Sequence, residues 1–430
     1  MVSMLNILVT IYFLLFFFLA WKNFRLAVIL FIISLPTYLI RFQLGPLPST
    51  VLELTFGALS LAWLIKYSRY DFKKILVAMQ KHKVLFIAFS LFFISSVVSV
   101  LISDLLILSL GVWRAYFLEP MILFLILIGR KDAVKTIDLI LGLAISTLSI
   151  SIYAIAQKFT GWGIATPEWV DESTRRVTAF FSSPNAVGLY LAPVLMLMIF
   201  MVIKKSKQQS RDIKFWVLAV VAVLSLVAII FTKSQGTWIG LGVGLLVFLF
   251  FLNYKKTALA VAVIGVVFAL LIPSMRQVIL FRDQAGQNRL RLLGYTEIFL
   301  SKSPRNFILG TGLGEFFRKV QKPYYNDKIM ERLIFPHSIF INFWTETGLV
   351  GMSAMITILG YSFFLANKIK KNNIVVGAGL MGMLTVLVVH GMVDVPYFKN
   401  DLSFLFWIIM ALPIQLEAEL LIRQASQIRK

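Results

Sequence analysis

The stretch RLIFPHSIFINFWTETGLVG, residues 332–351, passes from a long polar segment into a strongly apolar one. The apolar run continues to residue 366, which is long enough for a helix that crosses a lipid bilayer. His337, one of three histidines in 430 residues, lies at the junction, and Glu346 places a carboxylate inside the apolar run. The stretch therefore indicates a membrane helix, and it raises the question whether its polar end is structural or belongs to an enzyme site.

Apolar runs of helical length recur along the whole chain. Hydrophobic residues make up 59% of the sequence and charged residues 14%, which is typical of a polytopic α-helical membrane protein. We expect a single integral membrane domain, 1–430, that is all-α with about 12–13 transmembrane helices, because the first two runs form a tight pair. The candidate spans are 5–21, 25–40, 51–65, 84–102, 105–128, 136–156, 186–203, 215–231, 236–252, 257–272, 338–366, 374–391 and 402–418.

The composition also excludes several classes of protein. The first run, 5–21, lacks a small-x-small cleavage site, so we expect a retained membrane helix and not a cleaved signal peptide. The chain has no cysteine, which excludes disulfides, thiolate metal ligands and a cysteine nucleophile. A net charge of +22 would suggest a nucleic-acid partner for a soluble protein, but Lys and Arg also collect in the cytoplasmic loops of membrane proteins. We therefore expect membrane lipids as partners, and neither nucleic acid nor a cofactor.

The connections between the apolar runs alternate in charge. One set, which includes KYSRYDFKKILVAMQKHK, GRKDAVK and KKSKQQSRDIK, is rich in Lys and Arg, and the positive-inside rule places it in the cytoplasm. Two long loops, 157–185 and 273–337, then face outward. The second holds eleven Lys and Arg against five Asp and Glu, a net charge of +6. A basic outer loop beside the bilayer suits an anionic lipid head group or a lipid-linked phosphate, and a merely solvated loop is the alternative.

The segment RRVTAFFSSPNAVGLYL, residues 175–191, places Arg175 and Arg176 just before a membrane helix. The SPN sequence is typical of a turn and a helix start, with Ser182 or Ser183 as the cap. The planar arginine side chain donates two hydrogen bonds to a phosphate and keeps its positive charge. The segment therefore predicts phosphate binding by arginine. The alternative is an interfacial arginine pair that contacts lipid phosphates.

Residues 288–317, NRLRLLGYTEIFLSKSPRNFILGTGLGEFF, have the pattern of an amphipathic helix, a turn and a glycine-rich segment. Arg291, Tyr295 and Ile298 fall on one helical face, which sets Arg291 beside an aromatic ring able to pack on a sugar. The sequence GTGLG resembles a phosphate-binding loop, but no strand precedes it and no Lys-Ser/Thr follows. We therefore expect a tight outward turn near the substrate and not a nucleotide site.

If the opening stretch is one continuous helix, Trp344 lies about 20° from His337 and Glu346 about 180° away. Gly348 and Gly351 then share the face of His337 and allow a neighbouring helix to approach closely. This geometry argues against a His–Glu pair, and we expect Glu346 to bond to another helix. A lone interfacial histidine is more often structural than catalytic. His337, however, closes the basic loop at the membrane surface and can exchange a proton near neutral pH.

Other polar residues inside or beside the spans are weaker candidates. Arg114 and Glu119 lie within one candidate span, where charges are costly unless paired or functional, and we expect structural pairing. His390 and Asp394, four residues apart at the outer end of a span, are expected to bond to each other or to shape the outer cavity. Two residues are too few for a metal site, so none is predicted.

Three segments together resemble the O-antigen ligase and O-antigen polymerase family of bacterial envelope glycan assembly. They are RVTAFFSSPNAVGLYL, RLLGYTEIFLSKSPRNFILGTGLGEF and PHSIFINFWTETGLVG, in the family's order from about residue 176 to 351. The third is the most specific, because a histidine that opens a helix is followed by a glutamate and a glycine pair. The hydropathy profile extends the resemblance over nearly the whole chain.

The resemblance implies a GT-C-like integral membrane glycosyltransferase with a long, partly helical extracytoplasmic loop. Such enzymes move a glycan from undecaprenyl pyrophosphate to an acceptor hydroxyl, on lipid A-core or another surface glycan. They act at the outer, periplasmic face of the bacterial cytoplasmic (inner) membrane. The family's two essential arginines and its histidine fall on Arg176, Arg291 and His337, which are expected to be catalytic. Five further residues are expected to contact the substrate: Arg175, Arg289, Asn185, Tyr295 and Trp344.

The implied chemistry needs few groups, because a lipid pyrophosphate is already a good leaving group. The arginines would stabilise its growing negative charge without a metal, and His337 would orient or deprotonate the acceptor hydroxyl. The resemblance implies a single displacement with inversion at the anomeric carbon, and the outer loops contain no DxD metal motif. Arg175 and Arg289 are the alternatives to the two catalytic arginines. The reserve candidates for the base share the 157–185 loop: Glu168, Asp171 and Glu172.

Two departures from the family pattern leave the subfamily open. Ser234-Gln235-Gly236 stands where the family commonly has Ser-Arg-Gly, and Tyr295 stands where it often has tryptophan. A ligase and a polymerase share the same donor chemistry, so both remain. A transporter or flippase for lipid-linked saccharides is the alternative from another class. Transporters often show internal repeats and charges at mid-membrane. This chain shows no visible repeat, and its charged candidates cluster towards the outer surface.

Overall fold

The computed structural model describes residues 4–44, 47–326 and 332–428. Its contacts divide the chain into two compact units. The first unit comprises Met1–Lys83, Leu118–Ser234 and Tyr397–Lys430, and the second comprises Val84–Phe117 and Gln235–Pro396. Each unit therefore combines segments that lie far apart in the sequence, and each has its own helical core.

The first unit is built from helices and one short hairpin. The hairpin pairs Arg41 with Thr50 and Leu44 with Leu47 in an antiparallel register. The elements are α1 (Met4–Lys22), α2 (Phe24–Ile33), η1 (Leu35–Leu39), β1 (Arg41–Leu44), β2 (Leu47–Thr50), α3 (Val51–Lys66), α4 (Ser68–Lys81), α7 (Glu119–Gly129), α8 (Thr136–Thr160), η3 (Pro167–Trp169), α9 (Pro184–Lys207), α10 (Ile213–Thr232) and α18 (Asn400–Ile428).

The second unit contains the remaining helices, and its described residues hold no strand. The elements are α5 (Lys83–Leu101), α6 (Leu106–Trp113), η2 (Arg114–Leu118), α11 (Gln235–Phe251), α12 (Lys255–Leu271), α13 (Pro273–Ile279), α14 (Gln284–Ser301), α15 (Pro304–Leu309), η4 (Phe317–Gln321), η5 (Lys322–Tyr324), α16 (Ile339–Asn372) and α17 (Ile374–Gly391).

A helix occupies each of the thirteen predicted ranges, so the prediction of an all-α polytopic membrane protein is confirmed. Among the described residues, however, eight helices are long and apolar enough to cross a membrane, or nine if the bent pair α3 and α4 forms one span. The expected 12–13 is higher because four predicted spans fall short of the 18 residues that a counted span needs: Ile7–Lys22 of α1, Phe24–Ile33, Gln235–Phe251 and Lys255–Leu271. The eight are Lys83–Leu101, Leu106–Gly129, Thr136–Thr160, Pro184–Lys207, Ile213–Thr232, Ile339–Asn372, Ile374–Gly391 and Asn400–Ser426.

Aromatic side chains fill the core of the first unit. Phe404 of α18 packs edge-on against Phe31 of α2, with ring centroids 5.1 Å apart, and Trp407 of α18 lies 5.0 Å from Phe124 of α7. The segment Leu402–Ile414 of α18 is apolar on nearly all of its faces, which suits a segment buried on every side. Burial of large aromatic surfaces is the main contribution to stability here.

Glycines set the closest helix packing of the second unit. Gly236, Gly240 and Gly244 recur every four residues along α11, so they share one face that lies against α17. A Cβ at Gly240 would lie 3.1 Å from the Cβ of His390, and one at Gly244 would lie 2.8 Å from the carbonyl oxygen of Gly382. Small residues at this spacing allow two membrane helices to approach closely. The packing positions His390 at the end of α17.

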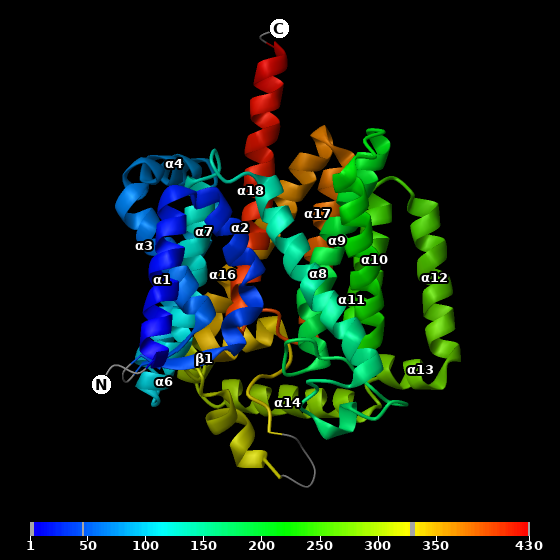
Figure 1. The fold of residues 1–430 in the computed structure, drawn as a ribbon. Coiled ribbons are helices and arrows are strands. Elements are labelled where there is room, and N and C mark those ends of the chain that lie inside the picture. The colour runs from blue at the N-terminus through cyan, green and yellow to red at the C-terminus, as the bar shows by residue number, and fades with distance from the viewer. Residues whose placement is uncertain (1–3, 45–46, 327–331, 429–430) are drawn as a thin grey trace. The chain divides into compact units, whose positions relative to one another are not determined.

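The 273–337 loop is partly helical, as expected. It contains α13, α14 and α15 and ends just before α16. Figure 1 shows α14 running across the direction of α11 and α12 in the same unit. α16 itself is broken at Gly348, whose φ of 74° and ψ of 179° are not helical. The loop and the break together shape the end of the second unit that carries His337.

Candidate functional site

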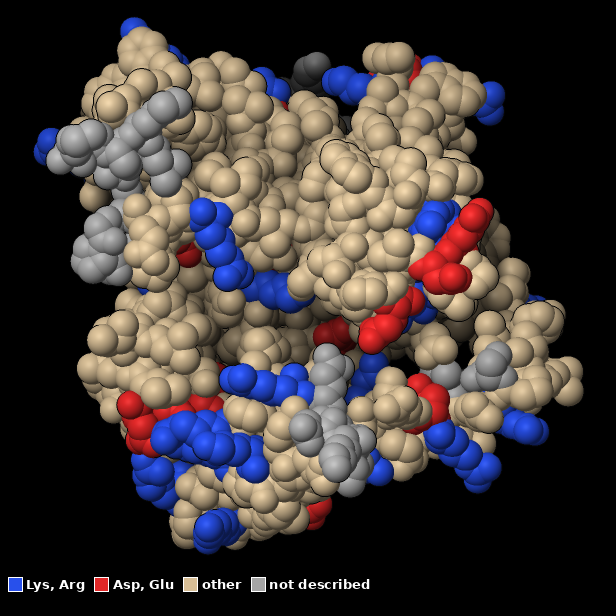
Figure 2. All heavy atoms as spheres, turned by 60° about the horizontal axis from the view of Figure 1, so that its bottom comes forward, with Lys and Arg blue, Asp and Glu red and all other residues tan. Residues whose placement is uncertain are grey.

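Basic and acidic side chains share the surface around α14. Figure 2 shows Lys and Arg side chains beside Asp and Glu side chains on the face that carries this helix. Asp327, Lys328 and Glu331, which contribute to the charge of the 273–337 loop, lie outside the described residues. The charge of the loop alone therefore does not define a site, and the surroundings of each candidate residue must be compared.

Arg175 holds the 157–185 loop together. Its side chain is 8% exposed, and its Nε and Nη1 donate to the carbonyls of Val170 and Lys158, each at 2.9 Å. Gly161, which ends α8 with φ of 68°, leaves room for the guanidinium, because a Cβ there would lie 3.2 Å from Nη2. These donors are directed at the backbone of the loop itself, so the structure gives Arg175 a structural role.

Arg176 is half-buried and has no ion-pair partner among the described residues. Its Nε donates to the carbonyl of Thr232 at 3.0 Å, and its Nη2 lies 3.4 Å from Oδ1 of Asn185. The ring of Trp169 lies 5.8 Å from the guanidinium carbon. Burial lowers the pKa of Arg176 from its ordinary value. A desolvated cation without a carboxylate favours binding of an anion.

Asn185 places this arginine at the start of α9. Ser183 is the N-cap, since its hydroxyl accepts from the amide of Ala186, which decides between the two serines considered as caps. Pro184 and Asn185 follow in the first turn. The amides and the dipole of a helix N-terminus also favour negative charge. The structure thus places Arg176 and Asn185 together, as expected, within the first unit.

Gln157 supports the same loop and was not singled out by the sequence motifs. It is fully buried, and its Oε1 accepts from the amides of Thr178 and Ala179 at 2.9 and 2.7 Å. Its Nε2 donates to the carbonyl of Ala179 at 3.2 Å. The one sequence feature that could have indicated this role of Gln157 is a polar residue near the end of an apolar helix. Gln157 holds the backbone that follows Arg176 in place.

The reserve bases of this loop are placed differently. Asp171 accepts hydrogen bonds from the hydroxyl and the amide of Ser173, and these bonds lower the pKa of its carboxyl. A carboxylate with a lowered pKa is a weaker base. Glu168 and Glu172 are exposed. The structure therefore offers no buried base in this loop among its described residues.

Arg289 and Arg291 leave α14 on different sides. The buried face of α14 carries Leu292, Thr296 and Leu300, and Leu292 packs with Phe316 and Val320. Arg289 is half-buried and lies within electrostatic range of His390. Arg291 is exposed. Of the two arginines considered for this helix, the structure places Arg289 near His390.

Tyr295 and Trp344 each pack on another aromatic ring. Tyr295 stacks on Tyr324 with centroids 4.5 Å apart and an interplanar angle of 12°. Trp344 meets Phe307 edge-on at 5.0 Å and donates from Nε1 to the Phe307 carbonyl at 2.7 Å. Both side chains are half-buried. The rings are thus held in place by the protein and remain partly open to solvent.

His337 lies beside a half-buried carboxylate. Its Nδ1 is 3.4 Å from Oδ1 of Asp394, which also accepts from the amide of Val395 at 2.8 Å. Burial alone would raise the pKa of Asp394, but its contact with His337 holds it below the ordinary value. Asp394 is therefore ionised at neutral pH. A carboxylate at Nδ1 keeps the proton there and leaves Nε2 of the imidazole as the acceptor.

His390 completes this group on the other side of Asp394. It is 1% exposed, and its Nε2 lies 3.5 Å from the hydroxyl of Thr237. The amide of Asp394 donates to the His390 carbonyl at 3.1 Å. The i, i+4 spacing placed the two residues together. It did not indicate that Asp394 contacts His337, because His337 lies far away in the sequence.

The assumption of a continuous helix from His337 is wrong. His337 has φ of 52° and precedes the N-cap Ser338, and Gly348 interrupts α16. The expected angles between His337, Trp344 and the glycines therefore do not hold. The absence of a His–Glu pair does hold, since His337 contacts Asp394 and Glu346 accepts a hydrogen bond from the amide of Gly314. The partner of Glu346 is thus a loop and not a helix.

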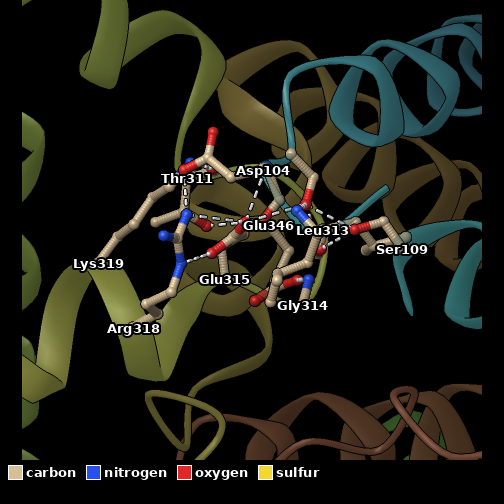
Figure 3. A network of polar contacts seen from close by, with 12 residues as sticks. Asp104, Ser109, Thr311, Leu313, Gly314, Glu315, Arg318, Lys319 and Glu346 are labelled. Carbon is tan, nitrogen blue, oxygen red and sulfur yellow. Dashed lines mark hydrogen bonds and ion pairs between the residues drawn. The ribbon is translucent and has the colours of Figure 1, made fainter. Parts of the chain in front are cut away.

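The GTGLG segment supports the break in α16. Its three glycines have φ of 71°, 89° and 79°, a conformation that glycine adopts without strain. Thr311 donates from its amide and its hydroxyl to the carbonyl of Thr345, at 2.7 and 2.9 Å, and Ser99 donates to the carbonyl of Glu346 (Figure 3). These amides point into the protein, so the segment is not a phosphate-binding loop.

Four charged residues form a cluster that begins directly after the GTGLG segment: Asp104, Glu315, Arg318 and Lys319 (Figure 3). Buried Glu315 accepts from Arg318 Nε at 2.6 Å and from the amide of Asp104 at 2.8 Å. Asp104 pairs with Arg318 and lies 3.4 Å from Lys319 Nζ. These pairs lower the pKa of Asp104, and they hold the pKa of Glu315 below its ordinary value although burial acts in the opposite direction. The cluster links the α5–α6 connection to the loop before α16.

The two units, built from apolar helices, define a multi-pass α-helical membrane protein. Residues 220–356 match the model of the O-antigen ligase family, which is the family that the motifs predicted. The match includes α14, the GTGLG segment and His337. No curated protein matches the chain. The family is one of glycan-processing membrane enzymes that take part in surface glycan assembly.

Proposed function

We propose that this protein transfers a glycan from undecaprenyl pyrophosphate to an acceptor hydroxyl, as an inverting, metal-independent membrane glycosyltransferase of GT-C type. The acceptor is lipid A-core or another surface glycan, as in an O-antigen ligase. The reaction takes place at the outer face of the bacterial cytoplasmic membrane. The proposal rests on the family match and on the surroundings of His337 and of the unpaired arginines.

The contact between His337 and Asp394 is the observation that carries the proposal. The 3.4 Å separation of Nδ1 and Oδ1 supports a tautomer whose proton is on Nδ1. Nε2 then takes the proton of the acceptor hydroxyl as the oxygen attacks. Asp394 stabilises the imidazolium that forms, as an ionised carboxylate beside a histidine does in other enzymes.

The leaving group requires positive charge without a competing carboxylate. Arg176 meets this requirement, because it is half-buried and is not paired with an acid among the described residues. We assign it to the pyrophosphate, together with Asn185. Arg289 is the second candidate, because it is half-buried near His390, whereas Arg291 is exposed. Fixed cations of this kind stabilise developing negative charge in a low-dielectric site.

The reaction balances as a single displacement. The acceptor oxygen forms a bond to the anomeric carbon as the bond between that carbon and the pyrophosphate oxygen breaks. The hydroxyl proton passes to His337, and undecaprenyl pyrophosphate leaves with the bonding electrons. Attack from the side opposite the leaving group inverts the anomeric configuration.

Reconstitution of the purified protein with an undecaprenyl-pyrophosphate glycan and candidate acceptors tests the proposal. We expect a glycan–acceptor product of inverted anomeric configuration in the presence of EDTA. A product on lipid A-core identifies a ligase, and elongation of the lipid-linked glycan identifies a polymerase of the same family. Movement of the donor across the vesicle membrane without any product would contradict glycosyl transfer and would indicate a transporter.

A further inference from the structure

The chain turns sharply where α3 ends. α3 is apolar over Val51–Lys66, and α4 follows after one residue at an angle of 93°. Figure 1 shows α4 lying across the end of α3. The fourteen residues of α4 carry five charged side chains, so α4 is too short and too polar to cross a bilayer. A helix perpendicular to an apolar span at its end lies along the membrane surface.

Aromatic residues mark the level of that surface in the first unit. Trp21 ends α1 next to Lys66, whose Nζ donates to the Trp21 carbonyl at 2.6 Å and lies 5.3 Å from its ring. Tyr67 joins α3 to α4, and its ring lies 4.0 Å from the guanidinium of Arg130. Trp and Tyr with neighbouring cations are typical of the boundary between hydrocarbon and head groups. α4 begins at this level.

One face of α4 is anchored to the protein. Asp71 is fully buried and accepts from Trp63 Nε1 at 3.0 Å, and Ile75 and Ala78 are buried on the same side. Lys74 pairs with Asp132 at 2.6 Å and Lys81 with Glu417 at 2.5 Å. These contacts hold the helix in place and neutralise two of its cations.

The opposite face is exposed and combines cations with apolar side chains. Arg69 and Lys73, four residues apart, are exposed and have no hydrogen-bond or ion-pair partner among the described residues. Two like charges at this spacing repel each other unless an anion lies between them. Beside them Phe72, Leu76 and Val77 are 52%, 55% and 62% exposed. Apolar surface next to unpaired cations is the pattern of a helix that lies in the head-group region.

We propose that Arg69 and Lys73 form a binding site for the phosphate of an anionic phospholipid, with the acyl chains of that lipid beside Phe72, Leu76 and Val77. The inference does not depend on the proposed glycan transfer, because α4 contains none of the residues assigned to it. A surface cation contributes about 1 kcal/mol to anionic lipid binding, which corresponds to about a fivefold change in affinity. The two cations together should make the protein select phosphatidylglycerol over phosphatidylcholine.

Spin-labelled lipids test this directly. The full-length protein is reconstituted in phosphatidylcholine vesicles with spin-labelled phosphatidylglycerol or spin-labelled phosphatidylcholine, and the motionally restricted fraction is measured. We expect the protein to prefer phosphatidylglycerol, and the R69Q/K73Q variant to lose at least fivefold of that preference. Salt at about 1 M should reduce the preference of the unaltered protein, because it screens exposed charges.

Two further variants control for net charge and for folding. R211Q/K214Q removes the same charge from two exposed residues at the start of α10, and R69K/K73R keeps both charges in place. We expect both to retain the preference. An equal loss in R211Q/K214Q would show that general charge attracts the lipid and would overturn the site. Full selectivity in R69Q/K73Q, with an unchanged Tm, would also overturn it.

Discussion

His337 owes its place in the site to two neighbours rather than to its own helix. Its backbone is left-handed, with φ of 52°, and its imidazole faces Asp394. Asp394 also lies within electrostatic range of His390, and its charge is retained at neutral pH. At the scale of single residues, the proposed base is therefore positioned by Asp394, which lies about 57 positions further along the chain.

Replacement of His337 should stop the reaction without unfolding the protein. A general base contributes about 10²–10⁴-fold to rate, so His337→Ala should lower kcat by at least about 100-fold. Asp394→Asn keeps the shape but removes the charge, and we expect a smaller decrease in kcat with KM for the donor little changed. Rates are measured on the reconstituted protein. Near-normal activity in His337→Ala would remove its catalytic role.

The two arginines of the 157–185 loop should respond differently to substitution. Arg176 has no acidic partner in the part of the chain that the structure describes, so Arg176→Ala should reduce transfer by about 10²–10³-fold, the usual effect of a lost charge-stabilising donor, with a nearly normal Tm. Arg175 donates to two carbonyls of the loop, so Arg175→Ala should lower Tm as well. Activity and thermal unfolding are measured on the same preparations. A loss of activity for Arg175→Ala alone would reverse the assignment.

At the scale of the elements, α16 is a membrane helix whose helical backbone is interrupted at Gly348. The interruption at Gly348 gives the first turns of α16 a direction of their own, and they carry Trp344 and Glu346. The GTGLG segment supplies donors to the carbonyls that the break exposes. An unpaired carbonyl at membrane depth is costly, so the loop and the break stabilise each other.

Gly348→Ala should destabilise the protein. Its φ of 74° and ψ of 179° belong to a region open almost only to glycine, and a Cβ there would overlap the carbonyl oxygen of Ile308. We expect a loss of about 1–3 kcal/mol, measured as a lower Tm in detergent. Gly360→Ala is the matched control, because the same helix has no atom within 4 Å of a Cβ at that position. Equal stability of the two variants would exclude strain at the break.

At the scale of the whole molecule, each unit joins segments that are separate in the chain. In the second unit the cluster of Asp104, Glu315, Arg318 and Lys319 is one such junction. The pKa of Glu315 lies below its ordinary value in the folded protein. The stabilisation from its ionised form is therefore complete above the ordinary glutamate pKa of about 4.3 and is lost as the pH falls below that value.

Glu315→Gln should test this pH dependence. At pH 7 we expect the variant to be less stable by about 1–2 kcal/mol, because the charged hydrogen bond to Arg318 is lost. The difference in Tm from the unaltered protein should be constant above about pH 4.3 and should shrink as the pH falls below that value. Glu297→Gln, at an exposed position on α14, should leave Tm unchanged at every pH. A difference for Glu315→Gln that stays constant below about pH 4.3 as well would contradict the role of its charge.

Several features of this protein follow from local sequence alone. Apolar runs of helical length predict the membrane helices, because each helix satisfies its own backbone within the bilayer. The three motifs predict the family, the position of His337 and the arginine pairs. The sequence alone, however, does not decide which arginine of each pair contacts the substrate. Two residues of the same type that lie close together in the sequence differ only in the direction of their side chains.

The amino-acid sequence by itself determined the class of the protein, the positions of its helices, the basic loop and the histidine at the start of α16. The tertiary structure decided that Asp394 is the partner of His337. It decided that Arg175 is buried against two loop carbonyls whereas Arg176 is half-buried, and that Arg289 is half-buried near His390 whereas Arg291 is exposed. It also decided that α16 breaks at Gly348. These outcomes depend on contacts between segments that are distant in the sequence. The packing of the chain, and not any local sequence pattern, decides which side chains are buried and which are paired.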